Sequence, residues 1–125
     1  MQITIYHNPR CSKSRKTLEL IHAAGISPQT VAYLDKPPSG GRLVELAQML
    51  GIPVRQMLRR GETEFREATD LPGLDDDAAL ADWLSRNPRV LERPIVVDER
   101  GRRAVIGRPP ENVLELISGA GDKPA

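Results

Sequence analysis

The sequence predicts an α/β protein: a mixed four-stranded sheet flanked by helices, with a helical insertion between a β-α-β half and a β-β-α half. Three observations lead to this prediction. A strand pattern, a helical pattern and a second strand pattern occupy the first 34 residues. Two apolar strand patterns joined by a turn precede the last helical pattern. Helical periodicity dominates between them, so the parallel pair and the hairpin are expected to share one sheet.

The first half contains a buried strand over residues 2–6, a helix over 12–24 and a second strand over 29–34. Gly25 is expected to end the helix, because glycine adopts the left-handed conformation at low cost. A helix that connects two strands of one sheet is a crossover, so these strands should be parallel.

The segment from about residue 38 to residue 88 is predicted to form the helical insertion. Linker-type residues at 35–41 break the chain, Ser39 suits a helix N-cap, and Gly51 suits the end of that helix. The rest of the insertion is expected to form a short helix over 53–59, mainly loop over 61–73, and a helix that begins at three aspartates (75–77) and ends at Asn87-Pro88.

The C-terminal half is expected to contain a strand over 95–97, a turn over 98–101, a strand over 104–106 and a helix that follows Pro109-Pro110. Residues 119–125 are rich in glycine and predict a flexible tail. We therefore expect residues 1–118 to form a single domain.

Composition limits the possible partners and compartment. The 125 residues carry 18 basic and 17 acidic side chains, a net charge of +1, which favours neither nucleic acid nor membrane binding. The single cysteine excludes an internal disulfide framework and a Cys-rich metal site and fits a reducing compartment. No apolar run is long enough to span a membrane, and no signal peptide is visible, so we expect a cytoplasmic monomer. The three aspartates suit a helix start better than a metal site.

Cys11 follows the first strand and precedes the first helix. The N–H groups at a helix start stabilise a thiolate and can bind an oxyanion. Arg10, Lys13 and Arg15 add positive charge, and His7 lies four residues before the sulfur. The alternative is a small buried cysteine without chemistry, but the basic and polar neighbours disfavour it. The sequence therefore predicts a reactive thiol beside an anion site.

Several motifs carry a resemblance to a known family. They are IYHNPRCSKSR (5–15), Tyr33-Leu34, Pro37-Pro38, VRQMLRR (54–60), ERPIVV (92–97) and IGRPP (106–110). With these motifs in this order, the chain resembles the glutaredoxin-dependent arsenate reductase family, which has the thioredoxin-like fold.

The resemblance implies roles for particular residues. It makes Cys11 the nucleophile, His7 and Ser14 the residues that tune its thiol, and Arg59, Arg93 and Arg108 the ligands of the oxyanion. Arginine suits this task because its planar donors match the oxygens of a tetrahedral anion and its charge persists. The assignment of Arg59 is open, since Arg60 follows directly and Arg55 is near. The resemblance also implies a cis peptide bond before Pro94.

The implied reaction is the reduction of arsenate to arsenite, as in arsenical resistance. Cys11 would attack arsenate, glutathione would attack the resulting adduct as a co-substrate, and glutaredoxin would supply the second reducing thiol. No bound cofactor and no metal are expected. The single cysteine supports external thiols, because an enzyme that closes its own disulfide needs two.

Two alternatives stay open. The first is a glutathione-linked thiol reductase of the same fold that acts on another substrate. The second is a non-enzymatic regulator similar to the Spx proteins, which bind RNA polymerase. Typical Spx proteins carry a Cys-x-x-Cys switch, and Ser14 stands where the second cysteine would be.

Overall fold

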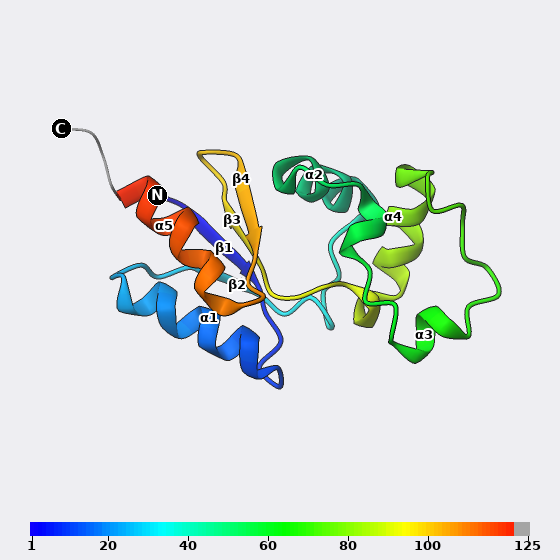
Figure 1. Ribbon diagram of the computed structural model, residues 1–125, viewed down its shortest axis with the longest axis horizontal. Helices are drawn as coiled ribbons and strands as arrows, with labels where there is room; N and C mark the ends of the chain where they lie inside the picture. The colour runs from blue at the N-terminus through cyan, green and yellow to red at the C-terminus, as the bar shows by residue number, and fades with distance from the viewer. Residues whose placement is uncertain (122–125) are drawn as a thin grey trace. The chain divides into compact units, whose positions relative to one another are not determined.

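The computed structural model describes the backbone of residues 1–121 and the side chains of residues 1–117. The chain divides into two compact units (Figure 1). Unit 1 combines Met1–Ala32 with Arg93–Ala125, and unit 2 is the continuous segment Tyr33–Glu92. Unit 2 contains the predicted insertion, with bounds at 33 and 92 in place of about 38 and 88. That the whole forms a single domain stays a prediction.

Unit 1 contains a four-stranded sheet in the order β2-β1-β3-β4 (Figure 1). The central strand β1 (Ile3–Tyr6) pairs in parallel with β2 (Gln29–Val31) and antiparallel with β3 (Ile95–Asp98). Strand β4 (Arg103–Ile106) pairs antiparallel with β3. The predicted mixed sheet is therefore confirmed.

Helix α1 (Ser12–Ala23), the short 3-10 helix η3 (Pro110–Asn112) and helix α5 (Val113–Gly121) complete unit 1. Buried side chains from β1, β3, α1 and α5 form one apolar cluster. Its members are Ile3, Ile5, Ile21, Val96, Val113, Leu116 and Ile117. Burying each large aliphatic side chain contributes about 1.5–3 kcal/mol, so this cluster holds both helices against the sheet.

Helix α1 ends as the sequence predicts. Gly25 has a φ of 79°, its N–H donates to the carbonyl of His22 at 2.9 Å, and the N–H of Ile26 donates to the carbonyl of Ile21 at 3.3 Å. This pair of bonds is the Schellman arrangement that satisfies the last carbonyls of a helix. The chain then turns back into β2 beside β1.

Unit 2 is helical. It contains α2 (Gly40–Leu50), the 3-10 helix η1 (Val54–Met57), α3 (Thr63–Arg66), α4 (Asp77–Arg86) and the 3-10 helix η2 (Pro88–Val90). The predicted caps are present: the Ser39 side chain accepts from the N–H of Arg42, and that of Asp76 from the N–H of Ala79. The core of this unit includes Leu43, Leu46, Val54, Met57, Leu80, Trp83 and Leu84, all almost fully buried.

Four details differ from the sequence prediction. The second strand ends at Val31 in place of residue 34, and the helix expected over 53–59 is only a 3-10 helix, η1. The sequence did not reveal η2. Helix α5 continues through Gly121, so residues 119–121 are helical where a tail was expected. A glycine inside a helix costs only about 1 kcal/mol, and the neighbouring Ser118 and Ala120 allow the helix to continue. Residues 122–125 lie outside the described residues.

Candidate functional site

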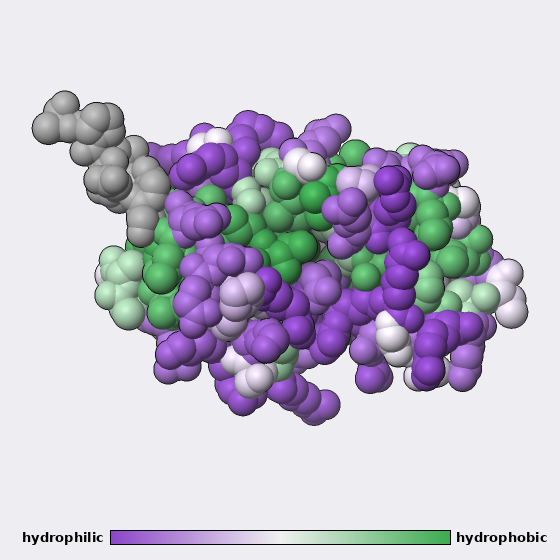
Figure 2. Space-filling view, in the orientation of Figure 1, coloured by the Kyte–Doolittle hydropathy of each residue, from purple (hydrophilic) through white to green (hydrophobic). Residues whose placement is uncertain are grey.

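Cys11 is the N-cap of α1, with extended backbone (φ −95°, ψ 120°). Its N–H donates to the carbonyl of Asn8 at 3.0 Å, and its own carbonyl accepts from the N–H of Arg15 at 3.0 Å, which opens the helix. The residue is partly exposed. On the face drawn in Figure 2, mainly hydrophilic residues cover the surface at the start of α1. The predicted position between strand and helix is thus confirmed, and the sulfur lies at the positive end of the helix dipole.

The electrostatic surroundings of Cys11 favour its thiolate. Burial raises the pKa of the thiol, but the N–H groups of Ser14 and Lys13 and the guanidinium of Arg93 outweigh that effect, so the pKa lies below its usual value. Hydrogen bonds and positive charge stabilise the ionised form of a thiol, which is the nucleophilic form. These surroundings therefore favour the nucleophilic form of Cys11.

The sheet register brings two of the predicted arginines to the thiol loop. Tyr6 lies opposite Ile95, and Ile95 lies opposite Ile106, so the segments after β1, before β3 and after β4 meet at one end of the sheet. The Nη2 of Arg108 lies 3.9 Å from the Sγ of Cys11, and its Nε donates to the carbonyl of Arg93 at 2.8 Å. Two fixed positive charges therefore accompany the thiolate, an arrangement that suits an oxyanion.

Both arginines precede a cis proline. The Arg93–Pro94 bond is cis, as expected, and so is the Arg108–Pro109 bond, which the sequence did not reveal. Between them, the N–H of Gly107 donates to the carbonyl of Pro94 at 2.8 Å. A Cβ on Gly107 would lie 2.6 Å from the Oγ1 of Thr17 and 2.8 Å from the Cγ of Pro94. Glycine is required here because the chain that carries Arg108 passes directly against α1.

His7 and Ser14 form a buried hydrogen bond, with 2.6 Å between Nδ1 and Oγ. The Ser14 Oγ also accepts from the N–H of Asn8 at 3.1 Å. Burial, and then the positive charge of Arg15, lower the pKa of His7 and so favour its neutral ring. We assign the Ser14 hydroxyl proton to this bond, with neutral His7 as the acceptor. The pair predicted from the family resemblance is thus brought together beneath the thiol loop.

Asn8 is a functional candidate that sequence reasoning missed. Its side-chain Oδ1 accepts from the N–H of Arg10 at 3.0 Å, while its backbone bonds both Ser14 and Cys11. The side chain is buried. The Asn-Pro pair was the available signal, because asparagine stabilises turns by accepting from the backbone two residues ahead. Asn8 therefore sets the shape of the loop that presents the sulfur.

Arg59 lies in unit 2. Its guanidinium forms ion pairs with Glu62 (Nη1 to Oε2, 3.9 Å) and Glu92 (Nε to Oε1, 3.7 Å), and its N–H donates to the carbonyl of Val90 at 2.6 Å. The neighbouring Arg60 is exposed and stacks over the ring of Phe65 at 5.9 Å. The role of Arg59 in binding an anion stays a prediction, as does the choice between it and Arg60.

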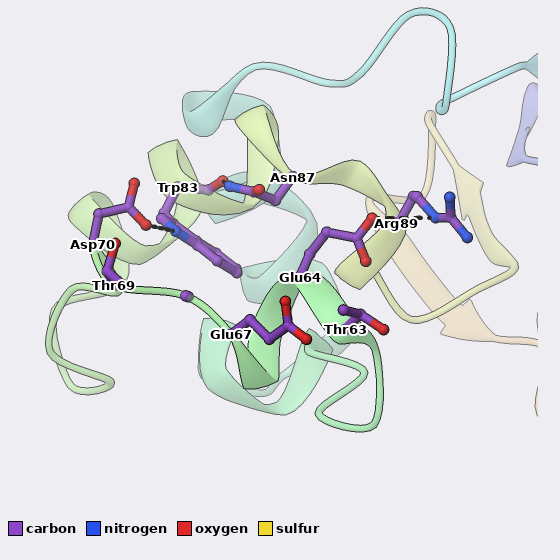
Figure 3. A pocket seen from close by; sticks show the side chains of 9 residues that line it. Thr63, Glu64, Glu67, Thr69, Asp70, Trp83, Asn87 and Arg89 are labelled. Carbon is purple, nitrogen blue, oxygen red and sulfur yellow. Dashed lines mark hydrogen bonds and ion pairs between the residues drawn. The ribbon is translucent and has the colours of Figure 1, made fainter.

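Unit 2 also has an open, polar hollow of about 550 Å³ between α3, η2 and α4 (Figure 3). Two of its carboxylates have partners within the unit: Glu64 pairs with Arg89 at 3.3 Å, and Asp70 accepts from the Trp83 indole N–H at 3.0 Å. No cysteine lines it. The hollow thus lacks the nucleophile that the thiol loop has.

Among the described residues, no group of three or more His, Cys, Asp and Glu side chains could hold a metal ion. None of the helices in the described part of the chain is long and apolar enough to cross a membrane.

Comparison with known proteins places this geometry in a family. The model of the ArsC family matches residues 6–116, which include the thiol loop and all three predicted arginines. The chain belongs to the ArsC family. The family that the motifs resemble is therefore confirmed, and so is the thioredoxin-like fold, through similarity to solved arsenate reductase structures.

Three relatives of this ArsC family member illustrate the similarity. The arsenate reductase of Haemophilus influenzae is 45% identical over 119 residues, covering 94% of this chain and 100% of that protein. A protein of Escherichia coli K12 named "Uncharacterized protein YfgD" is 42% identical over 117 residues, covering 93% of this chain and 97% of that protein. The solved structure of arsenate reductase from Vibrio cholerae is 44% identical with a TM-score of 0.81, covering 92% of this chain and 97% of that one.

Proposed function

We propose that this ArsC family member reduces arsenate to arsenite, with Cys11 as the nucleophile. The observation that carries the proposal is the Arg108 guanidinium 3.9 Å from a thiol whose pKa is lowered. Arg93 adds a second fixed charge at the same sulfur. Relatives named arsenate reductase, at 40–45% identity over more than nine-tenths of this chain, support arsenate as the substrate.

The arginines would hold arsenate while the thiolate attacks arsenic. A bond forms between sulfur and arsenic, and one arsenic-bound hydroxyl leaves as water after it accepts a proton. The cations stabilise the charge on the remaining oxygens, an effect that is strongest where water is partly excluded. Asn8 and the His7–Ser14 pair would keep the loop in place during attack.

External thiols would complete the reaction. Arsenate and arsenite differ by two electrons, and two thiols that become one disulfide supply them. We propose glutathione as the first thiol and glutaredoxin as the donor of the second. Water would then cleave the bond between arsenic and the Cys11 sulfur, which releases arsenite and restores the thiol. The 125 residues contain one cysteine, so the disulfide cannot close within the chain. Reduced glutathione is abundant in the cytoplasm, where we place the reaction.

A glutathione-linked thiol reductase with another substrate is the second candidate. The activated thiol and the two arginines suit a tetrahedral oxyanion but contain nothing specific to arsenic. An Spx-like regulator is less favoured, because position 14 holds a serine that is fully buried and bonded to His7. That position therefore cannot form the disulfide of a Cys-x-x-Cys switch.

The decisive assay follows NADPH oxidation with arsenate, glutathione, glutaredoxin and glutathione reductase. Wild type should turn over, Cys11→Ser should not, and phosphate or sulfate should compete with arsenate. No arsenate-dependent turnover in wild type, with Cys11 still reactive toward iodoacetamide at neutral pH, would remove arsenate as the substrate and favour the second candidate. Thiol-independent binding to RNA polymerase subunits would favour the regulator.

A further inference from the structure

Exposed cations lie close to Cys11 in the sequence. Arg10 lies in the loop, and Lys13 and Lys16 follow on the first two turns of α1, all with exposed side chains. The spacing of three places Lys13 and Lys16 on neighbouring positions of one helix face. The first turn of α1 has no acidic residue, and the first carboxylate in the helix is that of Glu19. We call Arg10, Lys13 and Lys16 the basic rim.

The basic rim differs in its pairing from six arginines of the chain. Within the described residues, no carboxylate lies within ion-pair distance of Arg10, Lys13 or Lys16. By contrast, ion pairs hold Arg42, Arg55, Arg59, Arg86, Arg89 and Arg103. Arg15, next to the rim, donates from Nη1 to the carbonyl of Pro9 at 2.8 Å and so supports the loop itself. The rim charges, like those of the exposed Lys36, Arg66 and Arg100, are therefore available to an external anion, but only the rim charges lie next to Cys11 in the sequence.

We propose that the basic rim binds the carboxylates of the small thiol that reacts at Cys11. This inference rests on the proposed function, in which an external thiol must approach the Cys11 adduct. Arg93 and Arg108 are placed to neutralise the oxyanion, so a second set of cations is needed for a reductant that is itself anionic. A neutral or cationic thiol gains nothing from such a rim and is repelled if positive.

The dimensions suit a tripeptide thiol. Lys16 is five residues beyond Cys11, which at about 1.5 Å per residue is about 7 Å along the helix axis. An extended tripeptide spans about 10 Å. A thiol of glutathione's size with its sulfur at Cys11 can therefore place a terminal carboxylate beside Lys13 or Lys16. Arg10, on the loop side of the sulfur, is available to the other carboxylate.

The test uses disulfide exchange at Cys11, which needs no arsenate. The Cys11 thiolate attacks one sulfur of a symmetric disulfide, forms a mixed disulfide and releases one thiolate. The rate with glutathione disulfide, which is anionic, is divided by the rate with cystamine, which is cationic. Both reactions use the same nucleophile, so a change in the Cys11 thiolate fraction cancels in the ratio. Mass spectrometry of the modified chain follows each rate.

The triple variant Arg10→Gln/Lys13→Gln/Lys16→Gln is compared with wild type and with Lys36→Gln/Arg66→Gln/Arg100→Gln. The control removes the same charge from exposed positions elsewhere. The ratio should fall about 2- to 3-fold per rim cation and about tenfold for all three, while the control stays near wild type. Added salt should reduce the wild-type ratio toward that of the rim variant.

Two outcomes would overturn the inference: an unchanged ratio in the rim variant, or an equal fall in the control. The KM for glutathione in the arsenate assay gives a second readout, and it should rise about tenfold in the rim variant alone. If wild type shows no arsenate turnover but the exchange ratio depends on the basic rim, the proposal of arsenate as substrate is contradicted and the inference about the basic rim is supported. If wild type turns over arsenate and the rim variant changes neither the exchange ratio nor the KM for glutathione, the inference about the basic rim is contradicted and the proposed function is supported.

Discussion

Gly107 offers the sharpest test of how the site is assembled. In the variant Gly107→Ala, the new Cβ would lie 2.6 Å from the Oγ1 of Thr17, 3.2 Å from its Cγ2 and 2.8 Å from the Cγ of Pro94. Ordinary contacts of this kind are about 3.5–4 Å, so the segment must move by about 1 Å away from α1. Neither neighbour can yield easily: Thr17 is fully buried and donates to the carbonyl of Lys13 at 2.7 Å, and Pro94 is a ring.

Overpacking of this kind costs about 1–3 kcal/mol in the free energy of unfolding. The next residue, Arg108, has its Nη2 only 3.9 Å from the Cys11 Sγ, so the same displacement carries its charge away from the sulfur. A misplacement of about 1 Å at a reacting group can lower the rate about 100-fold. We therefore expect Gly107→Ala to lower both stability and kcat/KM for arsenate.

Urea denaturation and the coupled arsenate assay measure the two effects. Gly73→Ala is the matched control, because its Cβ would meet nothing within 4 Å. Adding Thr17→Ala to Gly107→Ala removes two of the three close contacts and should recover part of the lost stability and rate. The reasoning is refuted if Gly107→Ala matches the control in both assays, or if the double variant is no better than the single one.

Two further predictions concern protonation. Arg93→Gln should raise the pKa of Cys11, because the thiolate loses a hydrogen bond and a nearby positive charge, and it should lower kcat/KM about 100-fold. The pH profile of iodoacetamide alkylation measures the pKa of Cys11. A profile that does not move in Arg93→Gln, as expected for the control Arg100→Gln, would contradict the prediction. The folded state lowers the pKa of His7, so the unfolded chain binds more protons at this residue. The resulting stabilisation of the folded state is present above the usual histidine pKa of 6.5 and is lost as the pH falls below that value. Urea denaturation from pH 8 to pH 5 should show that loss and a smaller one in His7→Gln; equal slopes would rule out His7 as the cause.

Local patterns predicted most of the fold. The alternation before Cys11, the helical spacing after it and the glycine at position 25 place β1 and α1 within one residue of the structure. Where local patterns failed, the structure was decided by an interaction with another part of the chain or by a free-energy difference too small to appear in the pattern. The end of β2 depends on where its pairing with β1 stops, and the continuation of α5 depends on a glycine penalty of about 1 kcal/mol.

The site could be predicted from the sequence less completely than the fold. The helix start explained why Cys11 should ionise, and the family resemblance implied that Arg93 and Arg108 bind the oxyanion. The exact contact depends on residues 97 positions apart, which meet only through the sheet register. The requirement for glycine at 107 has the same origin, because Thr17 and Pro94 converge on it from different elements. Constraints between residues that lie far apart in the sequence become visible only in the folded structure.

The hydrogen-bond network separates two tasks at the thiol loop. Neutral His7 accepts from Ser14, and Ser14 accepts from the N–H of Asn8, so this chain of bonds fixes the loop without adding charge. The charge at the sulfur comes from guanidinium groups and helix N–H groups, which do not titrate near neutral pH. Protonation of His7 would break its acceptor role and add a positive charge in a buried place. The positive field at Cys11 is therefore steady across the neutral range, and its response to pH is set by the thiol itself.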